Sequence, residues 1–253
     1  GGGPMRVRLR FAKLGKVRWT SHRDLARMWE RALRRVQLPV VYTGGFTPRP
    51  KVSFGLALPT GHESVAEYLD VELATADVDI VSLPARLSPA LPAGIDVTAA
   101  AVIDAGTGSL QESVSSCTWE LEAVGAEVDE IQLLVARALT ADSLVITRER
   151  KGTSVTDDVR SAIVSARVIG PPACIAEGYV DHAPGAVVLA ELATRTRSLR
   201  PAELLAALSI GRSEGLREGH VRRTHQWIER DGARREPLPL GATDAPHAEV
   251  RAS

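Results

Sequence analysis

The chain has 253 residues and no formal net charge, because 31 basic and 31 acidic side chains balance. This length allows one large domain or two packed halves of about a hundred residues each. Two cysteines without a C-x-x-C pair argue against a zinc or iron–sulfur site. No apolar run approaches the roughly 20 residues of a membrane-spanning helix, so we expect a cytoplasmic protein that binds no membrane, metal or cofactor.

Neutrality hides two segments of opposite charge. Residues 1–60 hold thirteen Lys and Arg against two acidic residues, whereas residues 61–146 hold fifteen acidic residues against two arginines. This asymmetry predicts a directional, cationic surface on the first segment. Phosphate-loop, dinucleotide-binding and G-x-S-x-G motifs are absent from the sequence, so an NTPase, a dinucleotide enzyme and a serine hydrolase are not indicated.

The first strand and helix have the clearest patterns. Arginine and apolar residues alternate through Arg6–Phe11, which predicts a strand with one buried and one cationic face. Ser21 and Asp24 have capping-box spacing, and apolar residues follow at helical intervals through residues 22–37. The other face of this helix carries five arginines: Arg23, Arg27, Arg31, Arg34 and Arg35.

The rest of the first half follows from periodicity and turn signals. Strands are expected at Val40–Tyr42, Lys51–Ala57, Ala66–Leu73 and Ile95–Val102, and a helix at Ile80–Leu91. The order strand, helix, strand, strand, helix, strand is that of a ferredoxin-like fold. We therefore predict a ferredoxin-like half over residues 5–105, with an inserted Gly/Pro hairpin loop.

The second half is predicted to repeat this pattern over residues 117–231. Strands are expected at Thr118–Val124, Leu144–Arg148, Val159–Val168, Ala173–Asp181 and Val187–Ala193, and helices at Val128–Leu139 and Pro201–Leu208. The absence of periodicity beyond this point predicts a disordered tail over residues 232–253. The expected fold class is α+β, with two tandem ferredoxin-like (βαββαβ) halves.

The segment Gly44–Gly55 combines glycines and prolines with cations and aromatic rings. Glycines permit a tight turn and prolines stiffen the chain, so that Phe46, Arg49 and Lys51 project from a backbone with little entropy left to lose. Such a loop suits single-stranded RNA, because phosphates attract the cations and bases stack on rings. The alternative for Phe46 is a role as a core anchor of the hairpin.

The arginine face of the helix has almost no glutamate at i+4, so its charges repel one another unless an anion lies across them. An ordinary solvated helix face is the alternative. We predict that the first strand, the helix and the loop form one cationic face. That prediction requires Arg23, Arg27, Arg49 and Lys51 to lie on the same side. The predicted nucleic-acid-binding residues are Arg8, Arg10, Arg23, Arg27, Arg31, Phe46, Arg49 and Lys51, with Lys151 and Arg160 as secondary candidates.

His22 begins the predicted helix, where the positive end of the helix dipole favours a neutral imidazole able to act as an acid or a base. Together with His62 it gives one alternative function, a metal-independent ribonuclease. The other interpretation of His22 is a structural hydrogen-bond donor. The six histidines show no close ligand spacing, so we expect no metal site.

Several pieces of the first half closely resemble the radical-SAM-linked domain family, whose members accompany B12-binding-type radical SAM proteins. They are Ser21–Leu25, Arg31–Arg35, Leu38–Val40, Gly45–Lys51 and Ala66–Leu73, with looser matches at the Lys151–Gly152 turn and Asp157–Arg160. The resemblance implies a non-catalytic companion of a radical enzyme that acts on RNA or the translation machinery. The chain lacks a C-x-x-x-C-x-x-C motif, so it cannot itself be the radical SAM enzyme.

We therefore expect an RNA- or ribonucleoprotein-binding companion that presents substrate to a separate radical SAM protein. The first alternative is the ribonuclease using His22. The second is a protein–protein adaptor whose basic face docks on an acidic surface of another protein, or of a second copy in a homodimer. Replacing His22 by Ala separates a binder from a ribonuclease, because only the ribonuclease should lose cleavage.

Overall fold

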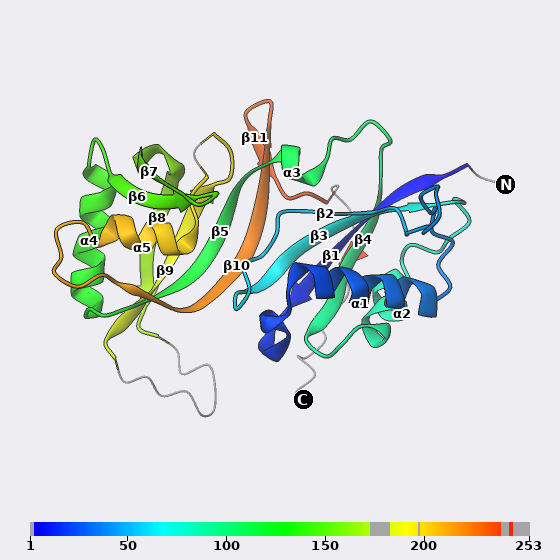
Figure 1. Cartoon of the computed structure of the whole chain (residues 1–253), viewed down its shortest axis with the longest axis horizontal. Coiled ribbons are helices and arrows are strands. Elements are labelled where there is room, and N and C mark those ends of the chain that lie inside the picture. The colour runs from blue at the N-terminus through cyan, green and yellow to red at the C-terminus, as the bar shows by residue number, and fades with distance from the viewer. Residues whose placement is uncertain (1–2, 173–182, 197, 239–242, 245–253) are drawn as a thin grey trace. The chain divides into compact units, whose positions relative to one another are not determined.

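The computed structural model describes residues 3–172, 183–196, 198–238 and 243–244. The chain divides into two compact units (Figure 1). The first comprises residues 1–114 and 227–253, and the second comprises residues 115–226. Strand β10 (Arg217–Arg230) therefore begins in the second unit and ends in the first.

The first unit is built around an antiparallel sheet. Its elements are β1 (Met5–Lys13), η1 (Gly15–Trp19), α1 (His22–Arg35), β2 (Val52–Phe54), β3 (Glu63–Leu73), α2 (Leu83–Leu87), η2 (Ser88–Ala90), β4 (Ile95–Ile103), α3 (Leu110–Ser113), β11 (Ala233–Arg235) and β12 (Thr243–Asp244). The strand order is β12-β4-β1-β3, and the short β2 also pairs with β3.

The two faces of this sheet differ because side chains alternate along each strand. Val7 and Leu9 of β1 and Leu69 of β3 lie on one face, in a core shared with α1 and α2. Helix α1 presents Trp29 to this core, and its ring meets the Phe11 ring edge-on at 5.0 Å. The apolar stripe of α1 is thereby buried, and its arginines are left to the solvent.

The opposite face of the sheet contains a buried ion pair. Arg8 and Asp70 are cross-strand neighbours in the β1–β3 register. Arg8 Nε and Nη2 donate to the two carboxylate oxygens of Asp70 at 2.7 and 2.9 Å, and Nη1 donates to the Pro237 carbonyl at 2.7 Å. The Arg8 residue is only 1% exposed. The C-terminal segment, with Leu238 packed near Tyr68, thus covers a strand face that the sequence predicted to be open.

The second unit contains β5 (Val114–Val124), α4 (Val128–Thr140), β6 (Val145–Arg150), β7 (Thr153–Asp158), η3 (Arg160–Ala162), β8 (Ile163–Gly170), β9 (Gly185–Ala193), α5 (Pro201–Leu208) and most of β10. Strand β5 lies between β10 and β9, and β8 pairs with β9. Strands β6 and β7 form a separate two-stranded sheet, closed at Lys151 and Gly152, which both have positive φ.

The prediction of two tandem ferredoxin-like halves is wrong. The second unit does not repeat the βαββαβ pattern, because the strand after α4 pairs with β7 in the separate two-stranded sheet. The first unit is not a contiguous half, because β12 returns from the C-terminal region to pair with β4. Both units are instead built mainly of β-sheet, and helices are few.

Many individual elements lie close to their predicted positions, but several differ. Strand β7 and the short helix η1 were not predicted. The predicted strand Val40–Tyr42 is reduced to isolated bridges to β3 and to Pro50. Strand β10 was missed because two of its buried positions are polar, Arg223 and Gln226. Part of the predicted disordered tail forms β11 and β12, whereas the predicted strand Ala173–Asp181 lies outside the described residues.

Breaking the buried ion pair between Arg8 and Asp70 should strongly destabilise the protein. Replacing Asp70 by Asn leaves a buried guanidinium without its anion, which costs about 3–5 kcal/mol of unfolding free energy. Glu72→Gln is the matched control, because the Lys51–Glu72 pair is exposed and contributes about 1 kcal/mol or less. Urea unfolding of the two variants measures both losses of unfolding free energy. Equal losses for Asp70→Asn and Glu72→Gln would contradict a structural role for the buried pair.

Candidate nucleic-acid interface

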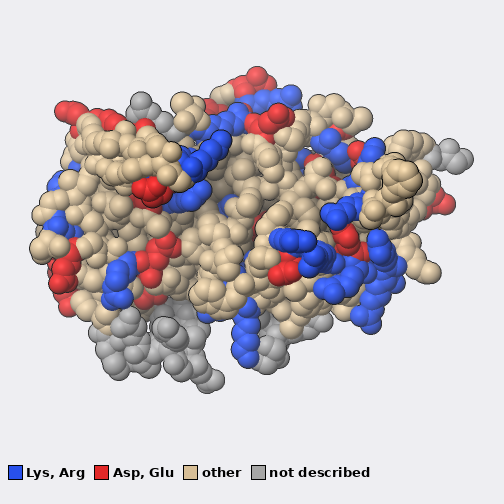
Figure 2. Space-filling model, viewed as in Figure 1, with Lys and Arg blue, Asp and Glu red and all other residues tan. Residues whose placement is uncertain are grey.

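Helix α1 presents a continuous arginine face, which we define as Arg23, Arg27, Arg31, Arg34 and Arg35. The Ser21 side chain caps the helix by accepting from the Asp24 amide at 3.1 Å, as the sequence predicted. All five arginines are exposed. Figure 2 shows Lys and Arg side chains gathered over α1 in the view of Figure 1.

The arginine face is poorly neutralised. Arg27 lies 3.7 Å from Asp24, in a pair where both side chains are more than half exposed. Among the described residues no ion pair joins Arg23, Arg31, Arg34 or Arg35 to an acidic side chain. Like charges three or four positions apart repel. The face therefore favours an external anion.

A hairpin over residues 42–50 carries the predicted Gly/Pro loop. Two hydrogen bonds close its base, from Thr43 N to Arg49 O and from Lys51 N to Val41 O, both at 2.8 Å. Phe46 at its tip is fully exposed and is not a core anchor of the hairpin. Arg49 is exposed as well. The hairpin thus offers an aromatic ring and a cation to the solvent.

Three other predicted binding residues, Arg8, Arg10 and Lys51, lie on the opposite side of the sheet from α1. Arg8 is buried against Asp70, and Arg10 is half-buried and donates to Thr98 Oγ1 at 3.0 Å. Lys51 pairs with Glu72 at 3.1 Å, next along the β3 face that carries Asp70. These cations are paired within the protein and do not join the arginine face, so the predicted single cationic surface is wrong on this point.

A groove of about 570 Å³ lies on this opposite side, next to the hairpin. It contains two cations and two anions: Arg6, Lys51, Asp70 and Glu72. Arg6 Nε lies 3.5 Å from Asp70, and Arg6 Nη2 donates to the Thr107 carbonyl at 2.7 Å. Because its charges are mutually compensated, the groove lacks the excess positive charge that a polyanion needs.

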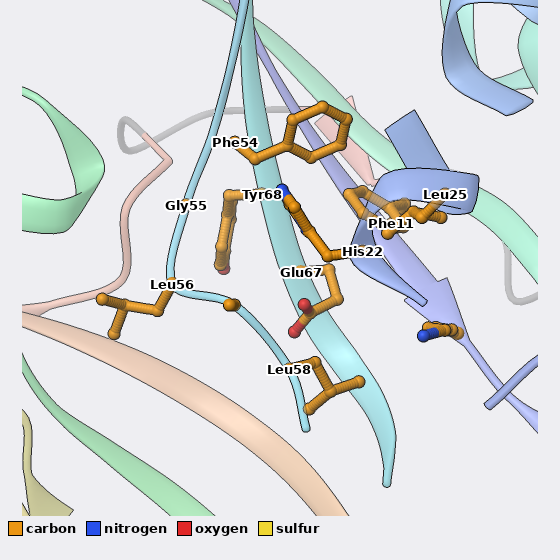
Figure 3. Close-up of a pocket in the computed structure, with 11 residues that line it drawn as sticks. Phe11, His22, Leu25, Phe54, Gly55, Leu56, Leu58, Glu67 and Tyr68 are labelled. Atoms are coloured by element: carbon orange, nitrogen blue, oxygen red, sulfur yellow. The ribbon is translucent and has the colours of Figure 1, made fainter. Parts of the chain in front are cut away.

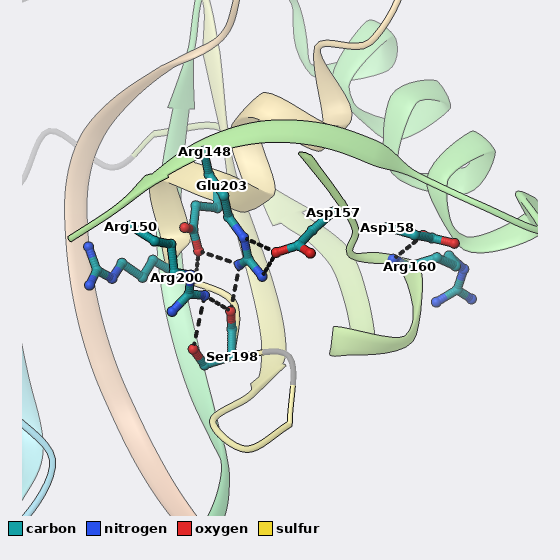
Figure 4. A network of polar contacts seen from close by, with 8 residues as sticks. All are labelled: Arg148, Arg150, Asp157, Asp158, Arg160, Ser198, Arg200 and Glu203. Atoms are coloured by element: carbon teal, nitrogen blue, oxygen red, sulfur yellow. Dashed lines mark hydrogen bonds and ion pairs between the residues drawn. The ribbon is translucent and has the colours of Figure 1, made fainter. Parts of the chain in front are cut away.

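Arg160 in the second unit has a structural role. It donates to the carbonyls of Leu139 and Ile163 at 2.7 and 3.1 Å and so satisfies the C-terminal end of α4. The neighbouring Arg148 bridges Asp157 and Glu203 in the network of Figure 4. Lys151, by contrast, is exposed at the turn between β6 and β7.

His22 borders a small cavity of about 10 Å³, which is room for roughly one water molecule. Figure 3 shows His22, Phe54 and Glu67 gathered around it, and the His22 and Phe54 rings meet edge-on at 5.1 Å. Lys13 also lines this cavity and donates to the Thr20 carbonyl at 2.9 Å. Burial lowers the pKa of Lys13, and the nearby Glu67 carboxylate partly opposes that shift.

The sequence interpretation missed Trp19. Trp19 ends the short helix η1 immediately before α1, an element that the sequence analysis did not predict. Its side chain is prominently exposed, with the Arg18 guanidinium 5.1 Å from the ring centroid. The available signal was composition: aromatic residues make up 4% of the chain, so each exposed ring carries information.

No cluster of three or more His, Cys, Asp or Glu side chains suited to a metal occurs in the described parts of the chain. None of the helices described has the length and apolar character needed to cross a membrane.

Residues 6–201 match a family model described as an uncharacterized protein conserved in bacteria, DUF2344. The chain belongs to this family. The DUF2344 match includes α1, the hairpin and the cavity beside His22, whereas β10 lies beyond it. No curated protein matches the chain.

The pKa of Lys13 gives a test of its burial. Burial holds this pKa below 10.5 in the folded state, so the unfolded chain binds the proton more readily. The stability contributed by Lys13 should therefore rise as the pH increases towards 10.5. Urea unfolding of the wild type and of Lys13→Met, at neutral pH and just below pH 10.5, isolates this effect. The wild type should gain stability relative to the variant, and a constant difference would show that Lys13 is not desolvated.

Proposed function

We propose that the first unit binds single-stranded RNA, free or within a ribonucleoprotein, along the arginine face of α1. The observation that carries this proposal is the row of exposed arginines on α1, whose one acidic partner in the described structure is Asp24, in an exposed pair with Arg27. Positions four residues apart on a helix are separated by about 6 Å along its axis. Arg23, Arg27 and Arg31 can therefore contact several charges of one polyanion at once.

The exposed aromatic tip of the hairpin favours a single strand over a duplex. Phe46 is presented to solvent next to the exposed Arg49, and the hairpin follows α1 closely in the chain. Unpaired bases can stack on such a ring, whereas the bases of a duplex are stacked on one another. Phosphates on arginines and a base on Phe46 together describe a single-stranded ligand.

The proposed role is that of a companion that presents this RNA to a separate radical SAM protein. Support for that partner comes from the sequence resemblance at Ser21–Leu25, Gly45–Lys51 and Ala66–Leu73. In the structure, the first two of these segments contribute the start of the arginine face and the exposed hairpin tip. Two of the segments that carry the resemblance therefore also supply proposed RNA contacts.

The arginine face should determine the salt dependence of RNA binding. Replacing Arg23 and Arg31 by Gln removes two proposed phosphate contacts, so the slope of log K against log salt should become shallower by about 0.7 for each contact. Fluorescence anisotropy with a labelled single-stranded RNA at several salt concentrations measures this. The matched control is Arg167→Gln with Arg217→Gln, which makes the same charge change at exposed positions of the second unit.

Lys51→Ala should leave RNA binding nearly unchanged, because Lys51 pairs with Glu72 on the other side of the sheet. Equal losses in the test and control variants would indicate a non-specific charge effect and contradict the proposal. Absence of binding at low salt would leave the protein adaptor as the better account. The RNA should remain intact, and cleavage abolished by His22→Ala would support the ribonuclease instead.

A further inference from the structure

Trp19 stands out among the exposed residues of the first unit. It is the last residue of η1, two positions before the Ser21 cap of α1, and it is 63% exposed. Exposing so large an apolar ring forgoes part of the hydrophobic stabilisation that its burial would provide. In the chain, Trp19 precedes Arg23, the first residue of the arginine face, by four positions.

The Trp19 ring rests on a backbone shaped to receive it. Residues 59–62 form a turn in which His62 N donates to Pro59 O at 3.1 Å, and Gly61 takes a φ of +91°. Gly61 N also donates to Arg18 O at 2.8 Å, which joins the turn to η1. A Cβ at residue 61 would lie 2.7 Å from Trp19 Cζ3, so only glycine permits this approach.

Buried charged residues hold η1 on both sides. Lys13 Nζ donates to the carbonyl of Thr20, which follows Trp19, at 2.9 Å. At the start of η1, Gly15 N donates to the buried Glu63 carboxylate at 2.7 Å. The Trp19 backbone is thus fixed before any ligand arrives, and binding would lose little conformational entropy at this position.

The cations around Trp19 suit a nucleotide. The Arg18 guanidinium lies over the Trp19 ring, 5.1 Å from its centroid, and donates a hydrogen bond to Gly15 O at 2.9 Å. Arg23, the second residue of α1, begins the arginine face. A base stacked on the ring would therefore have positive charge near its own phosphate and near the next one along the strand.

We infer that Trp19 is a stacking site for an unpaired nucleobase at the N-terminal end of the arginine face. The inference deepens the proposed function and rests on it. Arginines alone bind any polyanion, whereas a stacked ring distinguishes a chain with free bases from a bare sugar-phosphate chain. Trp19, like Phe46 on the hairpin, thereby favours single-stranded nucleic acid over a duplex.

The test compares two fluorescent probes of equal length and charge, an oligouridylate and an abasic ribose-phosphate chain. Trp19→Ala should weaken binding of the oligouridylate by about 5- to 150-fold, the range for loss of one stacked base, and leave the abasic chain unchanged. Trp19→Phe should restore most of the loss. Leu133→Ala is the matched control, because Leu133 is 71% exposed on α4 of the second unit.

A second variant tests the stacking site without removing the Trp19 ring. Gly61→Val should displace Trp19, because a side chain at residue 61 would meet the indole. It should therefore weaken binding of the oligouridylate and leave binding of the abasic chain unchanged. If Trp19→Ala weakens both probes equally or neither, the stacking site is overturned while the arginine face stands. If the wild type binds neither probe, the proposed function fails and the stacking site fails with it.

Discussion

The buried pairing of Arg8 with Asp70 is the interaction on which the first unit depends. It fixes the β1–β3 register from one side of the sheet, while the core beneath α1 fixes it from the other. A buried guanidinium is tolerated only when its donors are satisfied, and here Asp70 and the Pro237 carbonyl satisfy them. The same pairing ties the C-terminal segment to the sheet and removes Arg8 from the solvent.

This arrangement gives two groups of basic residues in the first sixty positions different roles. On one side of the sheet, Arg8, Arg10 and Lys51 are bound to groups of the protein itself. On the other side, the arginines of α1 remain exposed, with one weak pair to Asp24. Only cations that are not held by groups of the protein itself are available to a polyanion. The proposed interface therefore consists of α1 and its flanks together with the exposed hairpin tip.

Buried Lys13 connects the core with this interface. Its ammonium group leaves water to bind the Thr20 carbonyl, at a cost that lowers the pKa of Lys13. This lysine has a structural role, because its hydrogen bond to Thr20 holds the segment that links Trp19 to α1. The exposed ring, the capped helix and the arginine face then form one continuous stretch of chain, from Gly15 to Arg35.

The sequence by itself determined the local elements of the first unit, because α1 has a capping box and a strict apolar period, and β1 and β4 have apolar patterns that the core uses directly. It also identified the arginine face and the hairpin loop. It did not predict β10, because the polar residues Arg223 and Gln226 are typical of a surface although both are buried here. It also wrongly predicted two ferredoxin-like halves. Only the tertiary structure decided which cations face solvent, because Asp70 and Pro237 reach Arg8 from distant parts of the chain. It likewise decided the position of the Trp19 ring, which lies against Gly61.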